Sequence, residues 1–207
     1  PLRIGIPPML STLFFPELLT AFQEGYPDIP IILEEYGSVR ACNLVQNDTL
    51  DLGLVNMEQY NIDKFNNTLL ATDQIVFCIS DSHRLAKKEA VTTQEMAREP
   101  LIFFNADSVL NQILKNRFEV DGYTPNVIMR CSQIYTTLQF LKTGKYGCFL
   151  FSSMTDKFSD VIGIPLKNPI RIKIGMVWKK GKYMSNDMQV FLNFTQRYYK
   201  EHPLTGC

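Results

Sequence analysis

The sequence predicts an α/β fold made of two units, each a short sheet with helices. Short apolar segments alternate with segments of helical periodicity, and neither an internal repeat nor a low-complexity linker separates the two halves. The chain has 207 residues, of which 45% are hydrophobic and 12% aromatic, and this excludes a disordered chain. Lys and Arg number 21, as do Asp and Glu, and the zero net charge argues against a nucleic-acid-binding surface. No apolar run approaches the roughly 18–20 residues of a membrane span.

The first half is expected to form a β-α-β-α-β unit with a parallel sheet. Pro7-Pro8 ends the first strand, because proline has no N–H for a central strand. Ser11 or Thr12 is the expected N-cap of the helix that follows, and Gly25 ends that helix. The apolar face of this helix contains Phe14, Phe15, Leu18, Leu19 and Phe22. The expected strands are 2–6, 29–36 and 50–55, and the second helix is 37–47.

A second α/β unit follows. Thr92 and Glu95 have the spacing of a capping box and are expected to start a short helix. The other expected helices are 109–120, 134–141, 153–158 and 185–200, and the expected strands are 74–80, 101–104, 127–131, 148–151, 162–166 and 172–178. The expected connections between the units are Leu52–Val55 into Met57 and Leu101–Asn105. Two connecting strands would leave a cleft, where ligands usually bind.

Cysteine usage indicates a reducing, cytoplasmic setting. The five cysteines are odd in number and form no CxxC pair, which argues against a disulfide framework and a structural zinc site. Those at 42, 78, 131 and 148 are expected to be packed as small hydrophobes, and the fifth is Cys207. His83 lies in a polar loop and His202 beside Pro203, so both are expected at the surface. We expect no catalytic residue, no metal site and no cofactor.

Several stretches occur in an order that is typical of one known family. They are Leu2-Arg3-Ile4-Gly5, Phe15-Pro16-Glu17-Leu18-Leu19, Tyr26-Pro27-Asp28-Ile29, Glu34-Glu35-Tyr36-Gly37-Ser38, Leu50-Asp51-Leu52-Gly53-Leu54-Val55, Ser82-His83-Arg84-Leu85-Ala86, Glu99-Pro100-Leu101-Ile102 and Gly175-Met176-Val177-Trp178-Lys179-Lys180-Gly181. Over essentially the whole chain, the sequence resembles the effector-binding domain of LysR-type transcriptional regulators. It departs from the family at Arg84, where proline is usual, in the turn Gly144-Lys145-Tyr146-Gly147, and at Phe151-Ser152, where Leu-Pro is frequent.

The resemblance implies two Rossmann-like lobes joined by two crossover strands, as in type II periplasmic binding proteins. Lobe I would comprise residues 1–56 and 162–207, and lobe II residues 57–161. The resemblance also implies a ligand-sensing domain that binds a small metabolite, a carboxylate by our hypothesis, in the inter-lobe cleft and so controls transcription.

The same resemblance implies partners. DNA would be bound only through an N-terminal helix-turn-helix that this chain lacks, as the start at Pro1 suggests. Family members commonly form homodimers, and tetramers at full length, with no membrane partner. Phe14, Phe15 and Leu18 would be divided between the core and dimer contacts.

Helix N-termini facing the cleft are the predicted ligand sites, because their free N–H groups and positive dipole ends suit carboxylates. An alternative interpretation is that Ser11, Ser38 and Ser132 are ordinary helix N-caps without a ligand. Arg40, Arg130 and Arg171 are possible counter-charges, although exposed arginines are the commoner case. The predicted ligand-binding residues are Pro8, Met9, Leu10, Ser11, Ser38, Val39, Asn56, Asn105, Ser132 and Gln133.

Two other functions compete with the sensor. An extracytoplasmic solute-binding protein of a transporter would have the same fold, but the cysteine usage argues against it. An enzyme on a two-lobe scaffold is the third hypothesis, yet paired carboxylates, a phosphate loop, metal spacing and a triad are all missing from a recognisable context.

Overall fold

The computed structural model describes residues 1–58 and 62–204. The chain divides into unit 1, residues 1–72 with 173–204, and unit 2, residues 73–172. The sequence predicts these divisions after Asn56 and after Val161, so both divisions in the structure lie farther along the chain. No helix in the described ranges is long and apolar enough to cross a membrane.

Strand β1 (Leu2–Ile6) is the centre of a parallel arrangement in unit 1. It pairs in parallel with β2 (Ile31–Glu35) on one side and with β3 (Leu52–Asn56) on the other. Strand β3 also pairs antiparallel with the end of β8 (Val161–Lys179), where Gly53 lies opposite Val177. The predicted β-α-β-α-β unit is therefore confirmed, and the sheet that contains it is mixed.

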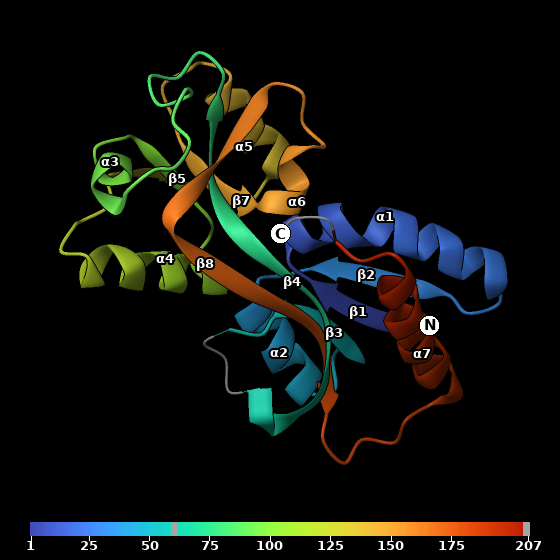
Figure 1. Ribbon diagram of the computed structural model, residues 1–207. Helices are drawn as coiled ribbons and strands as arrows, with labels where there is room; N and C mark the ends of the chain where they lie inside the picture. The colour runs from blue at the N-terminus through green and yellow to red at the C-terminus, as the bar shows by residue number, and fades with distance from the viewer. Residues whose placement is uncertain (59–61, 205–207) are drawn as a thin grey trace. The chain divides into compact units, whose positions relative to one another are not determined.

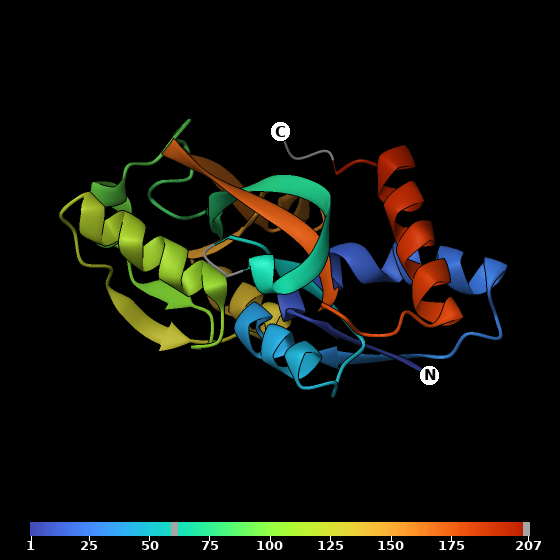
Figure 2. The same cartoon turned by 90° about the horizontal axis from the view of Figure 1, so that it is seen from below.

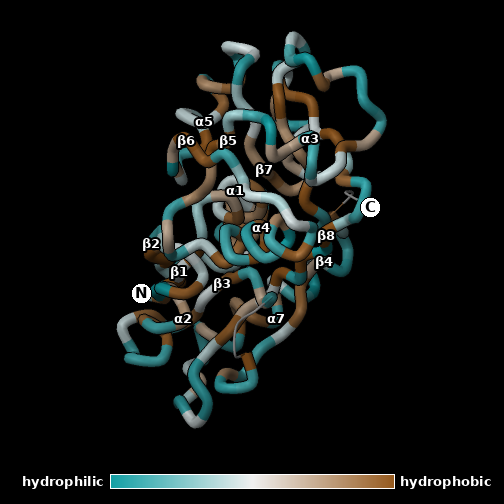
Figure 3. The backbone as a smooth tube through the Cα atoms, turned by 90° about the vertical axis from the view of Figure 1, so that its left-hand side faces the viewer, coloured by the Kyte–Doolittle hydropathy of each residue, from teal (hydrophilic) through white to brown (hydrophobic). Residues whose placement is uncertain are grey.

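Helices α1 (Pro8–Gly25) and α2 (Ser38–Gln46) lie on opposite faces of these parallel strands (Figure 1). Helix α7 (Asn186–Glu201) packs against α1, where the Tyr199 hydroxyl donates to the carbonyl of Phe14 at 2.9 Å. A short 3-10 helix, Ile62–Lys64, precedes strand β4 (Phe65–Ser80). Figure 3 shows apolar residues along the strands of each unit and hydrophilic ones in the connecting loops.

Unit 2 contains the second part of β4, the first part of β8 and three shorter strands. Strand β4 (Phe65–Ser80) pairs antiparallel with β7 (Cys148–Phe151), and β5 (Leu101–Phe103) pairs in parallel with β6 (Val127–Arg130). Helix α4 (Val109–Val120) lies alongside the two strands that it connects (Figure 2). The remaining helices are α3 (Thr93–Ala97), α5 (Ile134–Leu141) and α6 (Ser152–Thr155).

Phenylalanine rings form the centre of unit 2. Phe149 lies between Phe77, Phe103 and Phe118, with ring centroids 5.5, 5.9 and 6.4 Å away. All four side chains are at most 1% exposed. Gly147 approaches this cluster so closely that an added Cβ would lie 2.3 Å from the ring of Phe77. Glycine at this turn is therefore a packing requirement.

The prediction of which two segments connect the units is wrong. Strand β3 and Met57 lie wholly in unit 1, and Leu101–Asn105 lies wholly in unit 2. The chain instead enters unit 2 within β4 and returns within β8, which is a single strand where the sequence predicts two. The first half of β4 is mostly exposed or half-buried, so it lacks the apolar run by which a strand is recognised.

Three of the predicted buried cysteines are confirmed. Cys42, Cys78 and Cys148 are buried, whereas Cys131 is half-buried. The hydrogen bond between Cys148 and the neighbouring Cys78 thiol is the largest cause, and burial the second, of a pKa of Cys148 well above its ordinary value. Cys207 lies outside the described residues.

Candidate functional site

Helix α1 begins earlier than the sequence predicts. Pro7 is its N-cap, so the expectation of a cap at Ser11 or Thr12 is wrong. Proline at the first helical position has a suitable φ and no N–H to leave unpaired, which explains the early start. Since Ser11 N–H donates to the Pro7 carbonyl at 2.8 Å, only Met9 and Leu10 retain the unpaired N–H groups of a helix start.

Ser11 itself points to the edge strand. Its hydroxyl is within hydrogen-bonding distance of the Pro8 carbonyl (2.9 Å) and of Glu35 Oε1 (2.5 Å). Ser11 also borders a shallow groove of about 340 Å³ between α1 and β2, with Phe15, Leu19 and Leu33. Its hydroxyl proton therefore already has acceptors within the protein.

Helix α2 brings two predicted residues together. Gly37 is the N-cap, so Ser38 is the first helical residue and not the cap. The Ser38 hydroxyl accepts the N–H of Asn56 at 3.1 Å, and both residues are at most 5% exposed. Asn56 Oδ1 accepts the N–H of Glu58 at 3.0 Å, while Val39 is 37% exposed beside this contact.

Parallel pairing places the unit 1 residues at one edge. Because β1, β2 and β3 run in the same direction, the residues that follow them lie at the carboxyl ends of the strands. Met9 and Val39 follow β1 and β2, and Asn56 is the last residue of β3. Neither α1 nor α2 has a side-chain cap or an acidic residue in its first turn. This edge therefore presents two positive helix ends beside a buried asparagine.

Unit 2 contains a similar pair after its own parallel strands. Asn105 follows β5 and Ser132 follows β6, and the N–H of Asn105 donates to the Ser132 hydroxyl at 2.9 Å. Helix α5 begins just after, with exposed Gln133 as its N-cap, so the expectation that Ser132 is the cap is wrong. The Thr137 hydroxyl, in the second turn, is buried without a hydrogen-bond partner in the described part of the chain.

Sequence reasoning did not identify Asn111, a 4% exposed side chain that holds this loop. Its Nδ2 donates to the carbonyls of Phe104 (2.6 Å) and Asn105 (2.7 Å), and its Oδ1 accepts the Phe104 N–H at 3.0 Å. The sequence does place this asparagine beside the apolar face of α4, and that position indicates a buried polar side chain. The apolar residues of this face are Val109, Leu110, Leu114 and Phe118. Arg130 Nη1 also reaches the Phe104 carbonyl, at 3.4 Å, and adds a positive charge at this edge.

The other two arginines, Arg40 and Arg171, are exposed. The guanidinium of Arg40 lies over the ring of Tyr36, 4.6 Å from its centroid.

His83 is buried, contrary to the expected surface position. It is 5% exposed, its Nε2 lies 3.1 Å from Glu99 Oε2, and its Nδ1 accepts the Leu85 N–H at 3.2 Å. Burial lowers the pKa of His83, and the Glu99 carboxylate opposes this effect. Arg84 pairs with the other oxygen of Glu99. His202 is exposed as predicted, and no group of three metal-ligating side chains occurs among the described residues.

Comparisons with known proteins agree on one family. The family model described as the LysR substrate binding domain matches residues 1–200. The HTH-type transcriptional regulator YwbI of Bacillus subtilis (strain 168) is 30% identical over 200 residues, which are 95% of this chain and 66% of that protein. The chain therefore spans just under two thirds of this relative. The transcriptional dual regulator GltC of the same organism is 21% identical over 204 residues, 96% of this chain and 67% of GltC.

Solved structures share the fold. The regulatory domain of Synechocystis PCC6803 CcmR in complex with 2-PG has a TM-score of 0.86 and 21% identity, covering 96% of this chain and 97% of that one. The effector binding domain of QuiR in complex with shikimate has a TM-score of 0.80 and 19% identity, covering 97% of each chain. The predicted two-lobe α/β class is thereby confirmed.

Proposed function

Since the chain belongs to the LysR substrate-binding domain family, whose members are transcription regulators and not enzymes, we propose that it senses a small carboxylate. One observation carries this proposal. The N-termini of α1 and α2 lie uncapped at the carboxyl edge of the parallel strands, where the Met9, Leu10 and Val39 N–H groups suit an anion.

Unit 2 would supply the second set of contacts. The N-terminus of α5, the Asn105–Ser132 pair and Arg130 provide N–H donors and one positive charge. The inter-lobe position expected from the sequence is part of the proposal, with both units contacting one effector. The similar CcmR and QuiR structures, in complex with 2-PG and shikimate, support a small molecule as the ligand.

Effector binding would act on DNA through a conformational equilibrium. A ligand shifts a population only by its differential affinity for the two states, so a molecule that contacts both units favours the arrangement that permits both contacts. DNA binding would belong to a part of the regulator outside this chain. Family membership favours this role over the transporter protein considered from the sequence, and the cytoplasmic location stays part of the proposal.

Val39 offers a sharp test of the carboxylate. Val39→Asp places a negative charge in the first turn of α2, where it stabilises the helix dipole by about 0.3–1 kcal/mol but repels an anionic effector. Thermal unfolding with a panel of small carboxylates measures both effects, because a ligand of the folded state raises the midpoint. We expect one carboxylate to stabilise the unchanged chain and to lose that effect in Val39→Asp.

Val39→Asn is the matched neutral control and should retain the ligand response. Equal stabilisation of Val39→Asp and Val39→Asn by the same carboxylate would contradict the proposed site. A midpoint that no panel member raises in the unchanged chain would contradict the carboxylate class.

We also propose that two copies associate through apolar edge strands. Strand β2 is an edge strand of its sheet, and its Ile32 and Leu33 side chains are 44% and 37% exposed. Strand β6 is an edge strand of the other sheet, and its Ile128 side chain is 47% exposed. Edge strands with apolar side chains invite pairing with another chain. Phe14, Phe15 and Leu18 are at most 3% exposed, so they belong to the core of unit 1 and not to this surface.

Leu33→Lys should convert a dimer to a monomer, because a charge would then face the apolar contact. Sedimentation velocity measures the change, and Leu69→Lys, at another exposed leucine (52%), is the control. A chain that sediments as a dimer with Lys at position 33 would contradict the proposed surface. A chain that sediments as a monomer without substitution would contradict it as well.

A further inference from the structure

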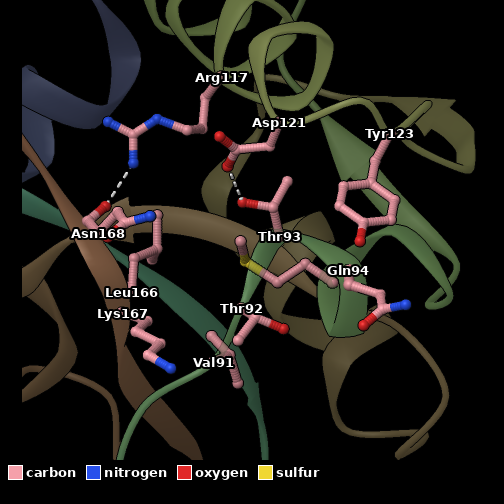
Figure 4. Close-up of a pocket in the computed structure, with 11 residues that line it drawn as sticks. Val91, Thr92, Thr93, Gln94, Arg117, Asp121, Tyr123, Leu166, Lys167 and Asn168 are labelled. Carbon is pink, nitrogen blue, oxygen red and sulfur yellow. Dashed lines mark hydrogen bonds between the residues drawn. The ribbon is translucent and has the colours of Figure 1, made fainter.

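A second hollow lies entirely within unit 2, and none of the ten predicted ligand-binding residues borders it (Figure 4). Its volume is about 370 Å³, within the ordinary range for small-molecule sites. Its walls are the start of α3, the last turn of α4 with the loop that follows, and the stretch of β8 around Leu166.

Backbone hydrogen bonds hold the base of this hollow. Val91 N–H donates to the Pro165 carbonyl at 3.0 Å, and Lys167 N–H donates to the Val91 carbonyl at 2.8 Å. Val91, Met96 and Leu166 are at most 5% exposed and form an apolar base. The hollow is therefore built on ordered elements, and its shape does not depend on one mobile side chain.

Two opposite charges border the hollow without pairing. Arg117 and Asp121 are four residues apart at the end of α4, a spacing at which such side chains commonly form an ion pair. No ion pair joins them among the described residues. Instead, Arg117 Nη1 donates to the Asn168 carbonyl at 2.5 Å, and the Thr93 hydroxyl donates to Asp121 Oδ2 at 2.5 Å. Figure 4 shows the two side chains directed to these separate partners.

Each charged group retains bonding capacity. A guanidinium carries five N–H donors and a carboxylate accepts about four hydrogen bonds, so one contact leaves both groups able to bind a ligand. Asp121 disfavours a simple anion, whereas Arg117 and the exposed Lys167 disfavour a simple cation. A molecule with one carboxylate and one ammonium group satisfies both charges, and the apolar base accommodates a side chain.

We propose that this hollow binds a free α-amino acid, with its carboxylate on Arg117 and its ammonium group on Asp121. Thr93 holds the Asp121 carboxylate in place, and the Asn168 carbonyl does the same for Arg117. The site is separate from the effector site proposed above, because its lining residues lie elsewhere in unit 2.

Two-dimensional NMR of the ¹⁵N-labelled chain tests the proposal. The probe is an equimolar mixture of the twenty common L-amino acids, followed by each amino acid alone. We expect saturable shifts of the Thr92, Thr93, Gln94 and Tyr123 amides for at least one amino acid. Shifts confined to amides such as Met9, Val39 and Asn56 would assign binding to the effector site and overturn this proposal, as would no shift at all.

Four variants assign the contacts. Arg117→Gln and Asp121→Asn should each raise the dissociation constant roughly tenfold or more, since each removes a charge-assisted hydrogen bond. Lys115→Gln and Glu119→Gln change the same charges on exposed positions of the same helix and should leave it unchanged. Binding that survives both Arg117→Gln and Asp121→Asn would overturn the site.

Single-charge probes separate the two contacts. Acetate should lose its weak binding only in Arg117→Gln, and methylammonium only in Asp121→Asn. If both probes depended on the same residue, the proposed orientation of the amino acid would be wrong.

Discussion

Units 1 and 2 each contain a hydrogen bond between a serine hydroxyl and the N–H of an asparagine, but the two bonds differ in burial. In unit 1 the Ser38 hydroxyl accepts the N–H of Asn56, and in unit 2 the Ser132 hydroxyl accepts the N–H of Asn105. Ser38 is the first residue of α2, and Ser132 directly precedes the N-cap of α5. Asn56 is the last residue of β3, and Asn105 lies two residues after β5. The first pair is buried, whereas the second is partly open to water.

The difference shows where each edge obtains its rigidity. Water can replace a lost partner at Ser132, but nothing replaces it at Ser38. Unit 2 compensates with Asn111, whose three hydrogen bonds fix Phe104 and Asn105 from behind. Unit 1 thus fixes its edge through the serine, and unit 2 through the asparagine on the next helix.

Removing Asn111 should have the largest effect on stability. Asn111→Ala leaves the buried N–H of Phe104 without its partner and the Phe104 carbonyl with only the long contact from Arg130, so we expect a loss of about 2–4 kcal/mol in the free energy of unfolding. Urea denaturation measures it. Gln112→Ala, an exposed neighbour on the same helix, should cost no more than about 0.5 kcal/mol. Similar losses in the two variants would remove the contrast between the units.

The two serines give the second test. Ser38→Ala leaves the buried Asn56 N–H unsatisfied and should cost about 1–3 kcal/mol. Ser132→Ala should cost less than about 1 kcal/mol, because water reaches Asn105. Urea denaturation of both variants under the same conditions measures the difference. If Ser132→Ala were the more damaging change, the ranking by burial would be wrong.

Acid should produce the smallest and most gradual difference. Burial lowers the pKa of His83 in the folded chain below the ordinary 6.5. At pH values between the folded-state pKa and 6.5, the unfolded state therefore binds more protons than the folded state. The stability of unit 2 is therefore full above about pH 6.5 and falls as the pH is lowered. Asp51 in unit 1 behaves differently. Burial raises its pKa, but hydrogen bonds from Arg3 and Lys182 outweigh this and lower it below 3.8, so its stabilisation is lost only in stronger acid.

Hydrogen exchange at pH 7 and pH 5.5 separates the two units. Protection should decrease around His83 and stay unchanged in β1 and β3. His83→Gln should flatten the dependence in unit 2, because its side chain does not titrate. Equal loss of protection in both units would contradict the assignment to His83.

Regular periodicity in the sequence predicts several elements to the residue. The ranges 2–6, 109–120, 134–141 and 148–151 agree with β1, α4, α5 and β7. The long strands β4 and β8 were not predicted as such, because pairing orders their polar stretches where local propensity is low.

The sequence predicts where in the chain the candidate site residues lie, but not which of them form hydrogen bonds with one another. The Asn105–Ser132 and Ser38–Asn56 hydrogen bonds join residues far apart in the chain, and no local pattern reports such pairs. The observed helix starts also differ from the predicted ones. Helix α1 begins at Pro8, because Pro7-Pro8 favours the first turn there and not at the later serine. His83 was misplaced because a polar loop sequence does not reveal that Glu99 would partner it.

Among the residues that the structure describes, the two crossings within β4 and β8 make unit 2 one uninterrupted stretch and unit 1 a composite of two segments. During synthesis, residues 73–172 leave the ribosome before the chain that completes unit 1. Strand β3 must therefore wait for residues 174–177 of β8 to pair with it, and α1 waits for α7. Unit 1, whose first segment is translated before unit 2, thus finishes folding after it.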